Sequence, residues 1–373
     1  MTASRTSPES ILIVRLSSVG DVVFALPALE QLRRAFPSAR IGWAVEDRAA
    51  DLLVGHPAID ELIIMPRRRW RRLRAEGTSR WRVWKEMRAF GRALRDHRFD
   101  VAIDFQGNLK SGLVTRTSGA KLRIGHARSE GREPNWWFTN RRVSFGGRVM
   151  HRIERDLELL SALDVPTEFH WPRLAFKADD RRIVDAFLSD LPGNGPLIVM
   201  NPGTSDWSPN KRWPAGHWAA LVDALVARRP GLRLVLNWGP GEEPLLDAIE
   251  LAAHAPIARP PLLKNMREVG HLMNQADLVI GCDTGPVHLA AALQRNVVAL
   301  FGPTDPRLYY PYRHPERALY ESIPCSPCRY RACPAVDCMR LISPARVLEV
   351  AEAALDGRVI APGRLAPRKT VKA

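Results

Sequence analysis

The sequence predicts an α/β protein built from two Rossmann-like domains, each a doubly wound parallel sheet covered by helices. The chain has 373 residues, of which 46% are hydrophobic and 25% charged, which suits two globular domains of roughly 150–200 residues. Runs rich in Val, Ile and Leu alternate with helical patterns, as is typical of βαβ units. The runs form two series, and a segment rich in Pro, Gly and charge (164–196) separates them as an expected linker.

The first series predicts four strands and one clear helix. The helix is Val22–Phe36, with apolar residues at Val23, Leu26, Leu29 and Leu32. The expected strands are Ile11–Leu16, Arg40–Val45, Asp60–Met65 and Asp100–Phe105.

The second series repeats this pattern. Its expected strands are Pro196–Gly203, Leu232–Gly239, Ala276–Asp283 and Asn296–Gly302, and its expected helices are Pro214–Arg228, Val287–Leu293 and Pro344–Leu355, the last capped by Ser343. A further helix, Asp179–Leu191, is expected inside the linker. We therefore predict an N-terminal domain (1–175), a C-terminal domain (176–345) and a C-terminal helix with a basic tail (346–373). Two such domains facing across a cleft form the GT-B architecture, in which ligands lie at the carboxyl ends of the strands.

A net charge of +15 is concentrated in one segment. Between Arg67 and Arg98 there are thirteen Lys or Arg against three Asp or Glu, interleaved with Trp70, Trp81 and Trp84. Basic residues with tryptophans suit an anionic surface, either nucleic acid or lipid headgroups. A solvated helix whose aromatic side chains pack inward is the alternative. Nucleic acid is the weaker choice, because the sequence has no helix-turn-helix, RNA-binding aromatic motif or zinc-finger spacing.

The sequence also bears on compartment and on metals. No run approaches the ~18–20 apolar residues that span a bilayer, and the first residues do not resemble a signal peptide, so we expect a cytoplasmic protein. In a reducing compartment disulfides are not expected. Four cysteines with C-x2-C-x4-C-x4-C spacing either bind a structural metal ion or form a loop of reduced thiols. They are Cys325, Cys328, Cys333 and Cys338.

Three segments that follow predicted strands contain side chains suited to chemistry. In Ser17-Ser18-Val19-Gly20-Asp21, the aspartate is either an N-terminal helix cap or a general base. Asn201-Pro202-Gly203-Thr204-Ser205, with Lys211 nearby, offers hydroxyls, amides and a cation for a pyrophosphate. Asp283-Thr284-Gly285-Pro286 opens a helix whose amides can face phosphate oxygens, and His288 follows about one turn later, as a site residue or as a packed histidine.

Together the motifs resemble the lipopolysaccharide heptosyltransferases of glycosyltransferase family 9. The resemblance extends from Ile11 to about Leu355 and rests on VRLSSVGDVVFALPAL, DFQGNLKSG, NPGTS with NKRWP, DTGPVHLAAAL and LFGPTDP. It implies an inverting transferase with the donor ADP-L-glycero-D-manno-heptose and Asp21 as the catalytic base. The donor-binding residues that it implies are Thr204, Ser205, Lys211, Glu243 (with Glu242 as a one-residue alternative), Asp283, Thr284, Gly285 and His288.

Within the family, RRRWRRLR and SEGREPNWWFTNRR are similar to heptosyltransferase I, whose acceptor is Kdo2-lipid A, whereas CSPC…CPAVDC is similar to heptosyltransferase II. An acceptor with carboxylates and phosphates would suit arginine forks. The acceptor-binding residues that we predict are Arg67, Arg68, Arg69, Arg71, Lys110 and Arg132. We expect no cofactor, no catalytic metal and no nucleic acid partner, and a monomer lying peripherally on the inner face of the inner membrane. The alternatives are a family 9 enzyme with another donor or acceptor (a second heptose or a protein), a nonhydrolysing sugar-nucleotide epimerase and a nucleic-acid-binding module.

Overall fold

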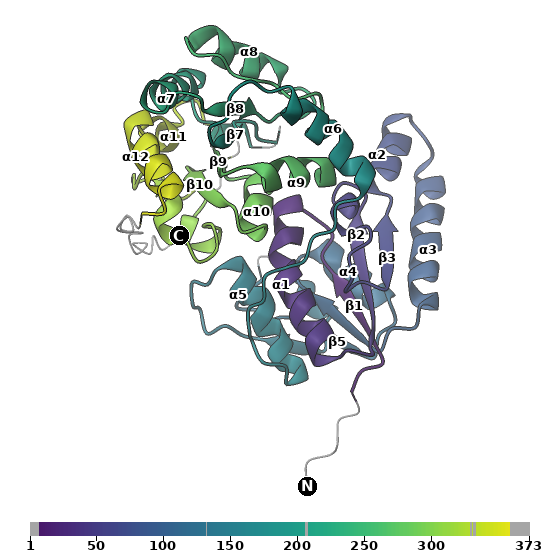
Figure 1. The fold of residues 1–373 in the computed structure, drawn as a ribbon. Coiled ribbons are helices and arrows are strands. Elements are labelled where there is room, and N and C mark those ends of the chain that lie inside the picture. Colours follow the sequence, from purple (N-terminus) through teal and green to yellow (C-terminus); the bar gives the residue numbers. More distant parts are fainter. Residues whose placement is uncertain (1–6, 132, 206–207, 329, 331–332, 359–373) are drawn as a thin grey trace. The chain divides into compact units, whose positions relative to one another are not determined.

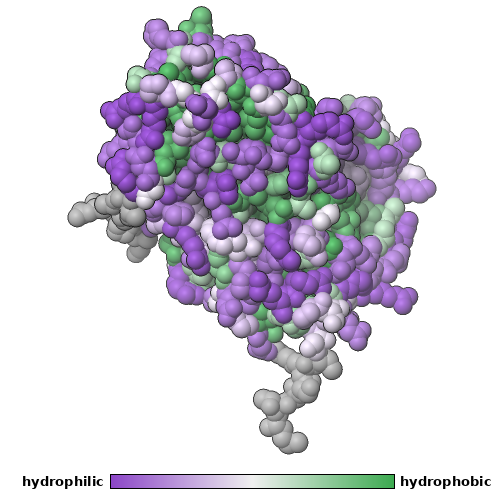
Figure 2. Space-filling view, viewed as in Figure 1, coloured by the Kyte–Doolittle hydropathy of each residue, from purple (hydrophilic) through white to green (hydrophobic). Residues whose placement is uncertain are grey.

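A computed structural model describes residues 7–131, 133–205, 208–328, 330 and 333–358. The chain divides into two compact units, unit 1 (Met1–Ala175) and unit 2 (Phe176–Ala373). Each unit contains one wholly parallel sheet with helices around it (Figure 1). Hydrophilic side chains dominate the face drawn in Figure 2, and apolar residues are gathered in smaller patches between them.

Unit 1 has a six-stranded sheet in the order β3-β2-β1-β4-β5-β6. Its strands are β1 (Ser10–Val14), β2 (Arg40–Glu46), β3 (Glu61–Met65), β4 (Val101–Asp104), β5 (Leu122–His126) and β6 (Arg141–Val143). Its helices are α1 (Val19–Ala35), α2 (Arg67–Ala75), α3 (Arg80–Asp96), α4 (Leu109–Thr117) and α5 (Arg152–Glu158), with short 3-10 turns such as Asn135–Trp137. The strand order reverses beside β1, and in open parallel sheets this switch point is where ligands bind.

Unit 2 has a five-stranded sheet in the order β11-β10-β9-β7-β8. Its strands are β7 (Leu197–Asn201), β8 (Arg233–Leu236), β9 (Leu278–Cys282), β10 (Asn296–Phe301) and β11 (Ala318–Tyr320). Its helices are α6 (Ala178–Ser189), α7 (Ala215–Arg228), α8 (Glu243–Ala252), α9 (Met266–Gln275), α10 (Gly285–Ala292), α11 (Asp337–Arg340) and α12 (Pro344–Leu355). Here the order reverses between β7 and β9, so the loops after these two strands lie together at the switch point.

Buried apolar side chains cover both faces of the second sheet. One core contains Trp213, Trp218 and Leu221 with residues of α12, and the other joins Val184 of α6 to Val269 of α9 and to residues of α10. Such two-sided burial explains why these strands are continuous Val, Ile and Leu runs rather than alternating ones.

All eight strands and the helices predicted from the sequence are present, and the differences lie mainly at their ends. The first helix begins at Val19, three residues before the predicted Val22, because Ser18 is its N-cap. Ser343 accepts the amide of Arg346 and caps α12 as predicted. Three strands, β5, β6 and β11, were not predicted, because they have only three to five residues and few consecutive apolar ones.

The segment expected to be a linker is largely structured. Arg173 forms a two-point ion pair with the buried Glu30 of unit 1, and Asp180 of α6 forms an ion pair with Arg267 of α9 in unit 2. The helix expected with the C-terminal tail, α12, packs against α7 and β10 within unit 2. The last part of the expected basic tail (359–373) lies outside the described residues.

Candidate active site

Asp21 lies in the first turn of α1, seven residues after β1 ends at Val14. The amide and the hydroxyl of Ser18 donate to Oδ2 of Asp21, at 3.1 and 2.9 Å, so the carboxylate caps the helix. About a third of the Asp21 side chain (32%) is nevertheless exposed. Because a carboxylate has about four acceptor positions, capping leaves Asp21 able to accept a further proton. The cap and the base are therefore compatible roles for one side chain.

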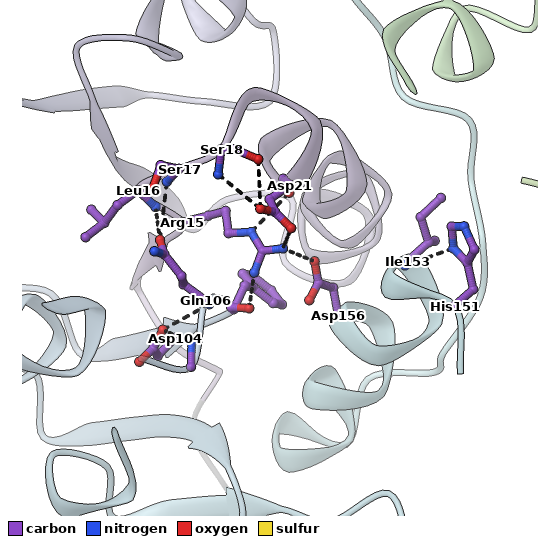
Figure 3. Close-up of polar contacts among 12 residues, drawn as sticks. Arg15, Leu16, Ser17, Ser18, Asp21, Asp104, Gln106, His151, Ile153 and Asp156 are labelled. Atoms are coloured by element: carbon purple, nitrogen blue, oxygen red, sulfur yellow. Dashed lines mark hydrogen bonds and ion pairs between the residues drawn. The ribbon is translucent and has the colours of Figure 1, made fainter. Parts of the chain in front are cut away.

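Arg15 holds Asp21 from the protein interior. Its Nη2 donates to Oδ1 of Asp21 at 3.0 Å, and its Nε donates to the Asp21 carbonyl oxygen at 3.1 Å (Figure 3). A third donor, Nη1, bonds to the carbonyl oxygen of Phe105. Burial raises the pKa of Asp21, but Arg15, Arg152 and the Ser18 bonds outweigh this and hold the pKa below its ordinary value. Asp21 is thus an oriented carboxylate that is ionised at neutral pH.

A second carboxylate, Asp156 of α5, is buried behind Arg15. Its Oδ2 lies 4.0 Å from Nη2 of Arg15 (Figure 3). Burial, with a smaller contribution from Asp21, raises the pKa of Asp156 to about 6, against the opposing effect of Arg15, Arg152 and Arg155. Neither Arg15 nor Asp156 was predicted as a site residue from the sequence, because Asp156 lies outside the motifs and Arg15 is surrounded by strand residues.

The DFQGNLKSG motif supports the loop that carries Ser17 and Ser18. The side-chain oxygen of Gln106 accepts the amides of Leu16 and Ser17, at 2.8 and 3.3 Å (Figure 3). Asp104 is buried and accepts the amides of Gln106 and Gly107. Gly107 has a φ of +72°, and a Cβ at this position would lie 2.4 Å from a carbon of the His126 ring, so the turn requires glycine. The motif therefore acts by shaping this loop.

In unit 2 the structure brings together three of the predicted donor-binding residues. Nζ of Lys211 lies 2.6 Å from Oδ2 of Asp283, and Nε2 of His288 lies 2.8 Å from Oδ1. Burial raises the pKa of Asp283, but Lys211 and then His288 outweigh it, so the net pKa is below the ordinary value and the carboxylate is ionised. Lys211 keeps 25% of its side chain exposed and can meet an anion while Asp283 holds it in place. His288 orients Asp283 in this arrangement.

The start of α10 presents backbone amides at the same switch point. Thr284 is the N-cap residue, but its side chain makes no capping bond. Its hydroxyl instead donates to the Cys282 carbonyl oxygen and accepts from Asn201, both at 3.1 Å, and Asn237 donates to Asn201 at 2.7 Å. Gly285 is the first helical residue. Helix amides that no side chain caps suit the oxygens of a phosphate.

The loop after β7 is held by its own contacts. Thr204 is buried, and its hydroxyl donates to the Ser208 carbonyl oxygen at 3.1 Å. The same hydroxyl accepts a hydrogen bond from Nε of Arg212 at 3.2 Å. The next residue, Ser205, is exposed. Arg212 was not predicted as a site residue.

The two acidic candidates near this loop differ in position. Oε2 of Glu242 accepts the Gly239 amide at 2.8 Å, and a Cβ built on Gly203 would lie 2.1 Å from the same oxygen. Glu243 is the first residue of α8 and is half-buried. The alternative residue, Glu242, is therefore the carboxylate beside the loop after β7, and donor binding by either glutamate stays a prediction.

Comparison with known proteins identifies the family of the chain. Residues 87–338 match the model of glycosyltransferase family 9 (heptosyltransferase). Lipopolysaccharide heptosyltransferase 1 of Pseudomonas aeruginosa is 32% identical over 87% of this chain and 87% of its own length. The chain belongs to glycosyltransferase family 9. The resemblance and the enzyme class predicted from the sequence are confirmed.

Other members of the family are similar across most of the chain. Lipopolysaccharide heptosyltransferase 2 of Salmonella typhimurium is 26% identical over 83% of this chain and 87% of its own length. The structure of Escherichia coli heptosyltransferase WaaC with ADP-2-deoxy-2-fluoro heptose is 31% identical, covers 80% of this chain and 90% of that chain, and superposes with a TM-score of 0.63. The prediction of two parallel-sheet α/β domains of GT-B type is confirmed.

The predicted acceptor-binding residues of this family 9 enzyme differ from one another in their partners and in their exposure. The guanidinium of Arg69 binds Glu86 of α3, and the amine of Lys110 binds the buried carboxylate of Glu46. Arg68 and Arg71 are exposed, Arg67 is half-buried, and Arg132 lies outside the described residues. Helix α2 follows β3, two strands away from β1 and its Asp21 loop in the sheet order. The role of these residues in acceptor binding stays a prediction.

Neither a metal site nor a membrane span occurs in the described part of the chain. No group of three or more His, Cys, Asp or Glu side chains is placed there to hold a metal ion. Cys325 and Cys333 are exposed, and burial followed by the neighbouring thiols raises the pKa of Cys338 to about 11. Among the described helices none is long and apolar enough to cross a bilayer.

Proposed function

We propose that this enzyme transfers heptose from ADP-L-glycero-D-manno-heptose to the Kdo region of a Kdo2-lipid A type acceptor, on the inner face of the inner membrane. The similarity to lipopolysaccharide heptosyltransferase 1 supports this reaction, and the donor analogue in the WaaC structure supports ADP-heptose as the donor. The observation that carries the proposal is the cluster at the switch point of unit 2, where Lys211 is held by Asp283 beside the start of α10.

The proposed step is a single displacement with inversion at the anomeric carbon. An acceptor hydroxyl oxygen attacks that carbon, the bond from the carbon to the ADP oxygen breaks, and ADP leaves with the bonding electrons. Asp21 takes the hydroxyl proton as the new bond forms, and such assistance contributes ~10²–10⁴-fold. Lys211 and the α10 amides stabilise the charge that develops on the diphosphate.

A direct assay tests the reaction. The purified chain is incubated with ADP-heptose and Kdo2-lipid A, and both ADP release and a mass gain of one heptose on the acceptor are measured. NMR of the product then reports whether the anomeric configuration is inverted. ADP release without a mass gain on the acceptor would contradict the proposed transfer.

Replacing the base tests the role of Asp21. Asp21→Asn should lower turnover by about 10²–10⁴-fold while the Kd for ADP stays nearly unchanged. Ser18→Ala is the control, because it removes one bond to the Asp21 carboxylate but keeps that carboxylate. If Asp21→Asn retains more than about a tenth of the wild-type turnover, Asp21 is a helix cap and not the base.

The alternatives give different results in the same assay. An enzyme that adds the second heptose would use only an acceptor that already contains one. An epimerase would convert the donor sugar with no acceptor present. A protein acceptor, or another donor sugar, would leave Kdo2-lipid A unmodified by ADP-heptose.

A further inference from the structure

Helix α3 presents tryptophans to solvent. Trp81 is 66% exposed and Trp84 is 49% exposed, and Met87 one turn later is 41% exposed. Trp70 of α2 behaves differently, since it is buried and packs edge-on against Phe90 of α3. The alternative considered from the sequence was that the aromatic side chains pack inward. Of the three tryptophans, only Trp70 does so.

The helical period separates the two faces of α3. Val83 and Leu94 are buried eleven residues apart, which places them on nearly the same side of a 3.6-residue helix. Trp81, Lys85, Arg88, Arg92 and Arg95 recur at spacings of three and four on the opposite side, and all five are exposed. We call the side chains of Trp81, Trp84, Lys85, Arg88, Arg92 and Arg95 the outer face of α3. The partly exposed Met87 lies at its edge, three residues after Trp84 and nearer the side of Val83.

The outer face combines cations with indole rings. The Arg88 guanidinium lies 4.6 Å from the ring centre of Trp84, and the Lys85 amine lies 5.5 Å from that of Trp81. The acidic Glu86 is on the other side of the helix, where it binds Arg69 of α2. Asp96, the last residue of the helix, is exposed on the same side as Lys85 and Arg92, but four cations outnumber it, so the net charge of the outer face is positive.

The position of α3 relates this face to the site in unit 1. The helix ends at Asp96, shortly before β4 begins at Val101 at the amino edge of the sheet. Its amino-terminal end, with Trp81 and Trp84, therefore points towards the carboxyl edge, where Asp21 follows β1. Figure 1 shows α3 running along the sheet of unit 1 beside β3.

We propose that the outer face of α3 docks on an anionic lipid bilayer, with the two indoles in the headgroup layer and the surrounding cations on lipid phosphates. Tryptophan suits the boundary between water and acyl chains, and Lys and Arg are attracted to anionic headgroups. A membrane fits better than a nucleic acid, because the exposed Met87 gains little from a phosphate backbone but gains from burial near acyl chains. The inference rests on the proposed function for its purpose, which is to bring the enzyme to a lipid-anchored acceptor.

Vesicle binding tests the surface without either substrate. The full chain is sedimented with vesicles of phosphatidylethanolamine and phosphatidylglycerol, and separately with neutral phosphatidylcholine vesicles. We expect binding to the anionic vesicles that weakens as salt is raised, and much weaker binding to the neutral ones. Trp81→Ala with Trp84→Ala should lower the partition coefficient about tenfold or more. Arg88→Ser with Arg92→Ser should lower it about 30-fold.

Matched variants in unit 2 control for general changes. Leu251→Ala removes an apolar side chain that is 91% exposed on α8, and Arg340→Ser with Arg346→Ser removes two exposed charges. Both should bind vesicles like the wild type. Equal losses in the outer-face variants and in these controls would overturn the proposal, as would unchanged binding in the outer-face variants. Tighter binding of the wild type to duplex DNA or RNA than to anionic vesicles, at one salt concentration, would also overturn it.

A kinetic comparison separates this inference from the proposed function. With a soluble acceptor that lacks acyl chains, Trp81→Ala with Trp84→Ala should leave turnover unchanged. With the acceptor embedded in anionic vesicles, the same variant should raise the apparent KM about tenfold. If the wild type transfers heptose to neither acceptor but the vesicle result holds, the proposed reaction is wrong and the docking surface stands. If transfer occurs and vesicle binding does not depend on the outer face, the docking surface is wrong.

Discussion

Removing Lys211 should affect stability and turnover separately, and the two effects can be distinguished. Lys211→Met removes the amine from the buried carboxylate of Asp283, whose Oδ1 keeps its contact with Nε2 of His288. Loss of one member of a buried ion pair costs about 3–5 kcal/mol. Lys211 retains a quarter of its surface exposed, so we expect about 3 kcal/mol. For a unit of this size that corresponds to a fall in Tm of about 6–12 °C.

A second substitution separates the two effects. Lys211→Met with Asp283→Asn removes the unpaired charge as well as the amine, so Tm should recover most of the loss. Turnover should stay at least about 10²-fold below the wild type, because the Lys211 amine then no longer faces the departing diphosphate. Arg346→Met is the charge-matched control in unit 2, and we expect it to change neither quantity.

Thermal unfolding and ADP release measure the two quantities on the same preparations. Recovery of turnover in the double variant would refute the reasoning, because Lys211 would then serve only to neutralise Asp283. An unchanged Tm in Lys211→Met would refute the structural half, since a buried carboxylate cannot lose its main cation without cost.

Two further predictions concern neighbouring residues. Burial raises the pKa of Asp156 from 3.8 to about 6. The folded state therefore holds the Asp156 proton more tightly than the unfolded chain does. This stabilisation is fully present below pH 3.8 and is lost as the pH rises through about 6, which lowers the free energy of unfolding by about 3 kcal/mol. Asp156→Asn should therefore gain about 3 kcal/mol relative to the wild type between pH 4 and pH 7.5 in thermal unfolding, and parallel stability curves would contradict this. Gly203→Ala places a Cβ 2.1 Å from Oε2 of Glu242 and should displace that carboxylate, weakening ADP binding about tenfold in calorimetry with little change in Tm. Gly216→Ala, which meets open space, is its control, and equal Kd values for the two variants would show that Glu242 is not a donor contact.

Much of the fold and part of the site could be predicted from the sequence. Buried parallel strands are continuous apolar runs, so eight of them were found, and residues directly after those strands, such as Asp21 and Asp283, follow from the topology rule for parallel sheets. The Ser18 turn, the Lys211 segment and the start of α10 are local in sequence, and local signals specify such turns and caps well.

Tertiary structure alone decided the remaining features. The pairing of Lys211 with Asp283 joins residues 72 apart, and Asp156 reaches Arg15 from α5, so no local pattern contains either contact. The choice of Glu242 over Glu243 beside Gly203 depends on the turn before α8, where a shift of one residue turns a side chain by about 100°. The outward direction of Trp81 and Trp84 was likewise undecided, because an amphipathic pattern with aromatic residues on both sides fits either orientation until Val83 and Leu94 are packed against the sheet. Composition and periodicity specify which elements form, whereas long-range contacts set the charge and exposure of each side chain on which the chemistry depends.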